Sequence, residues 1–214
     1  MNVAVIGSRQ VARALAEGFV KHGYSVMLGT RDPSKLVQWM ERNPKARVGS
    51  VADAAKFGEL IVLAVKGTAA LEVLRAADSR NLAGKIIIDV TNPLADTPPV
   101  NGVPGFFTTL NESLMERLQR AVPDARFVKA FNQVNASRMV NPRYAEGRPT
   151  MFICGNDIAA KQTVVKILDQ FGWESEDMGG VEAARAIEPL CMLWVIRYVL
   201  SKKFDHAFKL LKDP

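Results

Sequence analysis

The sequence has few of the residues on which nucleophilic and metal chemistry depend. Its 214 residues include only two cysteines and two histidines. Cys154 and Cys191 lie in apolar surroundings without a partner at metal-ligand spacing, so we expect buried thiols and neither a disulfide nor a metal site. His22 and His206 follow no predicted strand end, and a surface role is expected for both. These scarcities make nucleophilic and metal catalysis poor candidates for the function.

Long hydrophobic runs are also missing. The longest apolar stretch, 190–196, is followed by Arg197 and falls well short of the roughly 20 residues that a membrane span needs. The chain starts directly with a strand pattern, without the basic segment and apolar region of a secretion signal. We therefore expect a cytoplasmic protein with no membrane partner.

Charge of one sign is not concentrated anywhere in the chain. The net charge is +6, but the 28 basic residues are interleaved with 22 acidic ones. No recognition helix, zinc pattern or aromatic-basic RNA motif is present, so no nucleic-acid partner is expected. An anionic cofactor explains a basic surface more economically.

The first 35 residues predict a β-α-β unit. The short β-branched run 3–6 is typical of a strand buried on both faces, and Gly7 ends it. Apolar residues at helical spacing then lead from Val11 to Gly23, and 24–28 forms a second buried strand. The free amides at the start of such a helix favour an anion, usually a pyrophosphate.

The glycine pattern after the first strand only partly matches the dinucleotide fingerprint G-x-G-x-x-G/A. Gly7 and Ala12 occupy the first and third positions, while Arg9 replaces the second glycine. The Arg9 side chain must swing outward or obstruct the site, although a guanidinium can also bind phosphate. The alternative is a plain strand-to-helix turn that binds nothing.

The end of the second strand indicates which dinucleotide is bound. Enzymes that use NAD place Asp or Glu there, whereas this chain has Thr30 and Arg31, with Ser34 and Lys35 close by. A hydroxyl and two cations suit a 2′-phosphate, so we predict NADP(H) over NAD(H). Asp32 is interpreted as the N-cap of the next helix.

Strands and helices alternate along the rest of the chain. Further strands are expected at 46–48, 60–65, 85–90, 126–131, 150–154 and 173–178. This order predicts an α/β protein with a doubly wound, mainly parallel sheet, a Rossmann fold, over residues 1–180. The segment 181–214 is expected to be helical, with a break near Lys202, and to pack on the domain or on a dimer partner.

Polar residues after these strands are candidate ligands, because open α/β sheets bind ligands at the carboxyl ends of their strands. Lys66 could bond to cofactor phosphate or ribose, or could simply be solvated. Thr91 and Asn92, fixed by Pro93, are candidates for the nicotinamide carboxamide or the ribose. The irregular segment 96–110 is interpreted as a lid or binding loop, with a disordered linker as the alternative.

Several stretches together resemble one family, the NADPH-dependent coenzyme F420 reductases (F420:NADP oxidoreductases) and their bacterial relatives. The matching stretches are Val5-Ile6-Gly7, Leu28-Gly29-Thr30-Arg31-Asp32-Pro33, Asp89-Val90-Thr91-Asn92-Pro93-Leu94, Val128-Lys129-Ala130-Phe131-Asn132, 149–157 and 180–190. The reductase domain of the membrane metalloreductases is similar too, and we expect no membrane half here.

The resemblance implies hydride transfer between NADPH and a deazaflavin, usually in a homodimer. The cofactor-binding residues that we predict are Gly7, Ser8, Arg9, Gln10, Val11, Thr30, Arg31, Lys35, Ala64, Val65, Lys66, Asn92, Pro93, Ala130 and Asn132. The residues predicted to border the second reactant, coenzyme F420 or a flavin, are Leu94, Phe131, Met178 and Gly179. The departure from the family is Arg9 with Gln10, where the family has a second glycine and usually Asn.

Three interpretations remain open at this point. The first is an NADPH-dependent oxidoreductase whose second reactant is a deazaflavin, a flavin or another small hydride acceptor. The second is an imine reductase of the pyrroline-carboxylate type, which expects a long helical dimerisation domain that this tail is too short to supply. The third is an NADP(H)-binding sensor or regulator without hydride chemistry.

Overall fold

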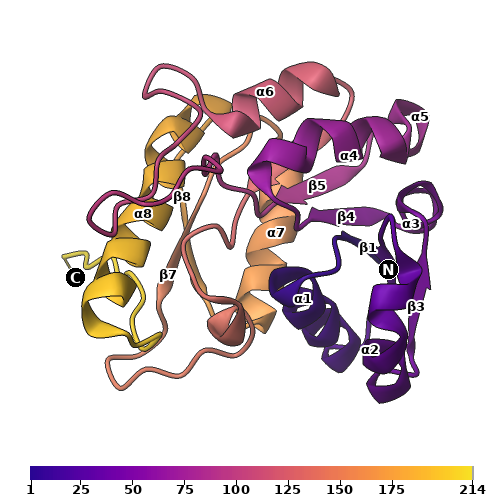
Figure 1. Cartoon of the computed structure of the whole chain (residues 1–214), viewed down its shortest axis with the longest axis horizontal. Coiled ribbons are helices and arrows are strands. Elements are labelled where there is room, and N and C mark those ends of the chain that lie inside the picture. The colour runs from indigo at the N-terminus through magenta and orange to yellow at the C-terminus, as the bar shows by residue number, and fades with distance from the viewer. Residues whose placement is uncertain (214) are drawn as a thin grey trace.

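A computed structural model describes residues 1–213 and contains a six-stranded parallel sheet (Figure 1). The strands are β1 (Asn2–Ile6), β2 (Ser25–Gly29), β3 (Ala46–Gly49), β4 (Leu60–Leu63), β5 (Ile86–Asp89) and β6 (Arg126–Lys129). Their spatial order is β3-β2-β1-β4-β5-β6, and every neighbouring pair is parallel. The predicted Rossmann fold is confirmed.

Helices cover both faces of this sheet, which explains why its strands read as continuous apolar runs. In β1, Val3 and Val5 belong to one hydrophobic cluster, whereas Ala4 and Ile6 belong to the cluster on the opposite face. The first face carries α1 (Gln10–Lys21), α2 (Val37–Arg42) and α7 (Ile158–Gln170). The opposite face carries α3 (Val51–Phe57), α4 (Ala70–Ala77), α5 (Ser79–Leu82) and α6 (Leu114–Ala121).

Two later strands form a separate parallel pair. β7 (Thr150–Ile153) and β8 (Glu174–Asp177) pair with each other and are not part of the six-stranded sheet. A single antiparallel bridge joins them to β6, where Lys129 N donates to Cys154 O at 3.0 Å. The seventh and eighth strands therefore exist as predicted but do not extend the main parallel sheet.

Short 3-10 helices mark several turns. They are η1 (Pro33–Leu36), η2 (Gly67–Ala69), η3 (Ala136–Arg138) and η4 (Val181–Ala183). The Asp32 side chain accepts from Ser34 N at 3.2 Å, which confirms its predicted role as an N-cap. The helix that Asp32 caps begins as η1 and continues as α2.

The C-terminal segment is helical only in its first part. α8 (Ala184–Ser201) ends where Lys202 adopts a left-handed conformation with φ 57°. The expectation of a helix beyond that point is wrong: residues 203–213 return across the protein, and Thr150 N donates to Phe208 O at 2.9 Å. His206 is not simply a surface residue, because its ring stacks on Trp194 with the centroids 4.6 Å apart.

Both thiols are buried and free, as predicted, and burial raises the pKa of each to about 12. Within residues 1–213, no helix combines the length and the hydrophobicity needed to cross a bilayer.

Candidate functional site

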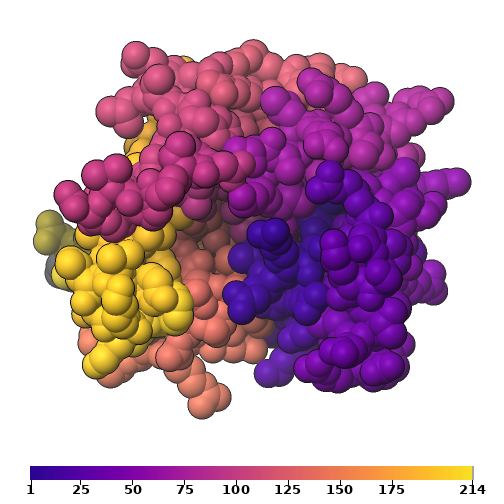
Figure 2. Space-filling model, viewed as in Figure 1, coloured from indigo at the N-terminus to yellow at the C-terminus, as the bar shows by residue number. Residues whose placement is uncertain are grey.

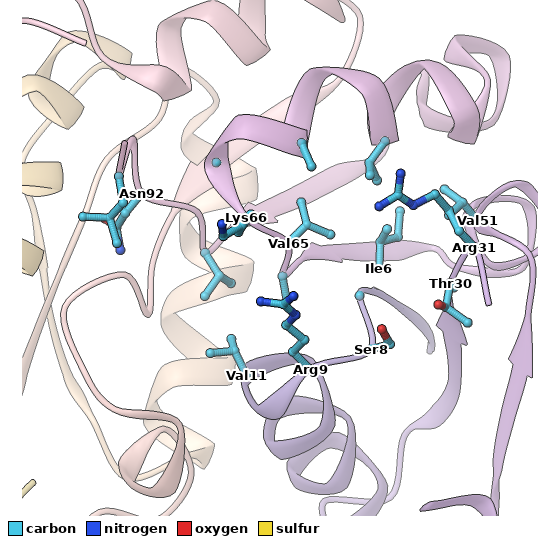
Figure 3. A pocket seen from close by; sticks show the side chains of 18 of the residues that line it. Ile6, Ser8, Arg9, Val11, Thr30, Arg31, Val51, Val65, Lys66 and Asn92 are labelled. Carbon is cyan, nitrogen blue, oxygen red and sulfur yellow. The ribbon is translucent and has the colours of Figure 1, made fainter. Parts of the chain in front are cut away.

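A cavity of about 530 Å³ opens at the carboxyl ends of β1, β2, β4 and β5 (Figure 3). β1 and β4 are neighbours at the point where the strand order reverses, which is where open α/β sheets bind ligands. The predicted site residues that line the cavity are Gly7, Ser8, Arg9, Val11, Thr30, Arg31, Ala64, Val65, Lys66, Asn92 and Leu94. On this face of the molecule a hollow separates the indigo N-terminal unit from the yellow C-terminal segment (Figure 2).

Gly7 is required by the close approach of two strand ends. Its φ is +143°, and a Cβ atom at this position would lie 2.3 Å from Ala64 O. Gly7 N donates to Gly29 O at 2.9 Å, so the turn is also tied to the end of β2. Any side chain here would push β4 away from the turn, because atoms at that distance overlap.

The start of α1 provides free backbone donors next to the cavity. Arg9 is the N-cap residue, and its side chain makes no capping hydrogen bond. The first amides of a helix have no intrahelical acceptor, so this 12-residue helix presents unpaired N–H groups and the positive end of its dipole. Both features favour a bound anion.

The Arg9 side chain lies along the cavity and extends from the start of α1 toward Val65 (Figure 3). The sequence left two possibilities, an outward side chain or an obstructing one. Here the guanidinium reaches into the space that a dinucleotide would enter. It therefore either contacts the ligand or has to move when the ligand binds.

Arg13 links the two turns at which phosphate groups are expected, and the sequence analysis missed it. Its Nε donates to Ser8 O at 2.8 Å, and its Nη2 donates to Lys35 O at 2.9 Å. The side chain thus spans from the glycine turn to the turn after β2. Both acceptors are backbone carbonyls, so no residue type in the two turns indicates this role. The only signal in the sequence is that Arg13 lies near the start of α1.

The turn after β2 carries the predicted 2′-phosphate ligands. Thr30 is buried, and its Oγ1 accepts from Asp32 N at 3.2 Å. Arg31 is exposed and pairs with Glu72 of α4 at 3.1 Å. Lys35 does not line the cavity and pairs with Asp32 at 3.2 Å; hydrogen bonds from Ser34 and Lys35 lower the pKa of Asp32.

Lys66, which follows β4, is paired across the cavity. Its Nζ forms an ion pair with Asp96 Oδ1, and both side chains are mostly exposed. This pair lowers the pKa of Asp96. Gly67 lies so close to the next strand end that an added Cβ would be 2.1 Å from Asn92 O. The β4 and β5 ends are therefore held together at the side of the cavity.

Asn92 and Asn132 meet at the ends of β5 and β6, as the strand order requires. Asn92 Nδ2 donates to Asn132 O at 2.8 Å, and Asn132 Nδ2 donates to Asn92 Oδ1 at 3.1 Å. Asn92 lines the cavity, while Asn132 is 3% exposed behind it. Pro93 and Ala130 are buried next to these two asparagines and do not line the cavity. Gln10, at the start of α1, is exposed and does not line the cavity either.

The residues predicted to border the second reactant are not all together. Leu94 lines the cavity, but Phe131 is 1% exposed and packs against Phe171 with the centroids 6.1 Å apart. The Phe131 side chain belongs to the core, and the role of Phe131 beside the second reactant stays a prediction. Met178 and Gly179 follow β8 outside the cavity lining, where Met178 is half exposed.

The segment 96–110 folds back on the end of β5. Leu94 and Phe106 form an antiparallel bridge, and Phe107 N donates to Pro93 O at 2.9 Å. The Phe107 ring packs beneath the Arg117 guanidinium, 5.8 Å from its centroid. The segment thus packs against the end of β5, and Phe107 does not line the cavity.

The comparisons with known proteins agree with the dinucleotide-binding geometry. The family model "NADP oxidoreductase coenzyme F420-dependent" matches residues 2–93. Metalloreductase STEAP3 of Rattus norvegicus is 31% identical over 219 residues, which are 99% of this chain and 42% of that protein. The F420-dependent NADP reductase of Methanocaldococcus jannaschii is 27% identical over 147 residues, 67% of this chain and 63% of that protein.

A solved structure resembles the whole fold. It is the crystal structure of an F420-dependent NADP-reductase candidate from Arthrobacter sp. FB24, with a TM-score of 0.93 and 35% identity. The match covers 98% of this chain and 99% of that one. By contrast, the chain spans less than half the length of the curated metalloreductases that it matches.

Proposed function

Because this chain belongs to the family of coenzyme F420-dependent NADP oxidoreductases, we propose that it transfers a hydride between NADP(H) and a small acceptor. The acceptor we favour is a deazaflavin such as coenzyme F420, with a flavin as the next choice. The single observation that carries the proposal is the cavity at the sheet's reversal point, bounded by the glycine turn and by cations.

The residues present fit a dinucleotide with three phosphate groups. The diphosphate would lie against the free amides of α1, next to the Gly7 turn, and Arg9 adds a cation there. The 2′-phosphate would lie at Thr30 and Arg31, where no carboxylate stands in the position that NAD enzymes use for the ribose. A guanidinium can bind such a phosphate through two parallel hydrogen bonds.

The nicotinamide end would then lie near Asn92, at the ends of β5 and β6. Bound NADPH would supply a hydride to the acceptor ring, and a proton from solvent would complete the reduction of the acceptor. The protein's part is to bind the dinucleotide, orient the ring and keep one ring face open to the acceptor. Few acid or base groups are needed for this reaction, which agrees with the scarcity of histidine.

The test is NADPH oxidation by the purified protein with coenzyme F420 and with FMN as separate acceptors. The proposal expects turnover with at least one acceptor and faster turnover with NADPH than with NADH. An Arg31→Ala variant serves as the matched control for cofactor selectivity. Turnover with neither acceptor, although NADPH binds, would reject the proposed reaction.

A second candidate function is an NADP(H) sensor without hydride chemistry, and Arg9 is the observation that favours it. Its side chain occupies space that the family's second glycine leaves free. The same assay separates the two functions, because a sensor binds NADPH and oxidises none of it. A homodimer and a cytoplasmic location remain predictions from the sequence.

A further inference from the structure

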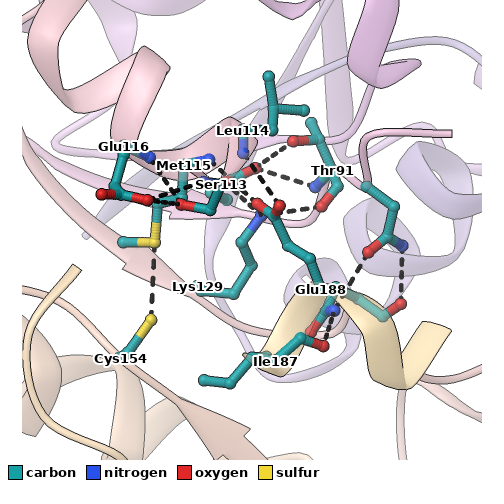
Figure 4. A network of polar contacts seen from close by, with 12 residues as sticks. Thr91, Ser113, Leu114, Met115, Glu116, Lys129, Cys154, Ile187 and Glu188 are labelled. Carbon is teal, nitrogen blue, oxygen red and sulfur yellow. Dashed lines mark hydrogen bonds and ion pairs between the residues drawn. The ribbon is translucent and has the colours of Figure 1, made fainter. Parts of the chain in front are cut away.

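A buried ionic network lies where β5 and β6 end and α8 passes over them (Figure 4). Lys129, the last residue of β6, is fully buried, with its Nζ 2.6 Å from Asp89 Oδ2 and 2.9 Å from Glu188 Oε1. Burial alone would lower the pKa of Lys129, but these two carboxylates raise it above its ordinary value. The lysine is therefore a permanent cation inside the fold.

Both carboxylates are fixed by further hydrogen bonds. Glu188 accepts from Leu114 N at 2.9 Å and from Met115 N at 3.0 Å, which satisfies two free amides at the start of α6. Asp89 Oδ1 accepts from Thr91 N at 2.9 Å and from Thr91 Oγ1 at 2.7 Å. Glu188 is thus held through both of its oxygens, and Asp89 through Oδ1, while Asp89 Oδ2 makes only the ion pair with Lys129.

This network continues to the cavity along two routes. Lys129 Nζ donates to Thr91 O at 2.9 Å, and the next residue in the chain is Asn92. Asn132 Nδ2 donates both to Asn92 Oδ1 and to Ile187 O at 3.0 Å. Together these contacts close a ring that runs through Thr91, Lys129, Glu188, Ile187, Asn132 and Asn92.

One atom in this ring is left without a partner. Asn132 Oδ1 is buried and has no hydrogen-bond partner among the residues that the structure describes. The Asn132 nitrogen faces Asn92 and Ile187, so the orientation of the amide leaves its oxygen as a free acceptor. This oxygen does not face the cavity, because Asn132 lies behind Asn92 and is not part of the cavity lining.

Stability alone is a weak reason for such a network. Apolar residues of similar size often replace buried ion pairs without loss of stability, because removing charges from water is costly. The ring of contacts lies at the wall of the cavity, so a function for these charges is to fix the orientation of the Asn92 and Asn132 side chains.

We infer that Lys129 and Glu188 are positioning residues for the nicotinamide end of the site, which they serve by fixing Asn92 at the cavity wall, through Thr91 on one side and through Asn132 on the other. The inference rests on the proposed function. It also makes α8 part of the site, although no residue of that helix lines the cavity. The adenosine end depends on Gly7 and Arg31, which lie outside the ring of contacts.

The experiment compares two ligands that differ only in the ring. One is NADP⁺, and the other is 2′-phospho-ADP-ribose, which lacks the nicotinamide. Titration of Glu188→Gln should show NADP⁺ bound about tenfold more weakly than by wild type, with 2′-phospho-ADP-ribose unchanged within about twofold. Binding of the second ligand also shows that the variant has folded.

Arg185→Gln is the matched control on the same helix. Arg185 pairs with Glu116 at 2.5 Å, next to the network but outside the ring of contacts. This variant should bind both ligands as wild type does. If Glu188→Gln does not fold, Glu188→Asp keeps the charge and should show a smaller loss, still confined to NADP⁺.

The outcomes separate the inference from the function. A loss confined to NADP⁺ supports the positioning role. Equal losses for the two ligands, or no loss for either, overturn that role and leave the proposed function intact. If wild type binds neither ligand, both the inference and the proposed function fail.

Discussion

Replacing Arg31 with alanine should weaken the binding of NADPH much more than that of NADH. A hydrogen bond between a guanidinium and a phosphate contributes about 1.5–3 kcal/mol. Binding must first break the ion pair between Arg31 and Glu72, whose side chains are 69% and 66% exposed, and such a pair contributes about 0–1 kcal/mol. The net loss is about 0.5–3 kcal/mol, or roughly two- to 160-fold in the dissociation constant of NADPH.

Calorimetric titration of both dinucleotides at one fixed ionic strength measures this effect. Glu72→Gln is the matched variant, because it removes the competing carboxylate and leaves Arg31 in place. It should tighten NADPH binding by up to about fivefold and leave NADH almost unchanged. An equal effect of Arg31→Ala on NADPH and NADH would refute the 2′-phosphate role of Arg31.

Three further predictions follow from particular contacts. Gly7→Ala should abolish detectable NADPH binding in the same titration, because the added Cβ would lie 2.3 Å from Ala64 O; wild-type affinity would contradict the geometry of the turn. Arg13→Gln should weaken NADPH binding severalfold while changing the melting temperature little, because it unties the glycine turn from the turn after β2. Glu116→Gln should destabilise the protein by about 1–3 kcal/mol at pH 7 in urea unfolding, through the lost charge-assisted bonds to Arg185. Hydrogen bonds from Arg185 lower the pKa of Glu116 from 4.5 to about 2; burial opposes this shift, and hydrogen bonds from Ser113 add to it. The charged form of Glu116 therefore stabilises the fold fully above pH 4.5. The difference between wild type and Glu116→Gln should therefore shrink as the pH falls from 4.5 toward 2, and a difference independent of pH would contradict it.

The fold was predictable because its signals are local. Short apolar runs such as 3–6 and 60–63 form buried strands, as their residues predict. The C-terminal tail was not predictable in this way. The chain after Lys202 is held by Trp194 and Thr150, two distant residues whose contacts leave no periodic pattern in the tail itself.

In the candidate site, too, local sequence patterns predict some features, while contacts between distant segments determine the others. Gly7 and Arg31 could be predicted because a turn and a strand end each have characteristic residues. The partners of the cations, among them Glu72 and Asp96, come from distant segments, so their ion pairs could not be inferred from spacing. The burial of the Phe131 side chain and its positive φ of +62° could not be predicted either, because no local pattern signals a left-handed phenylalanine.

The central claim is that this protein binds NADP(H) with selectivity for the 2′-phosphate. Titration of the wild-type protein with NADPH and with NADH, each at physiological concentration, tests it most directly. The account predicts one NADPH bound per chain and distinctly weaker binding of NADH. Failure to detect a complex with NADPH, or equal affinity for the two dinucleotides, would contradict it.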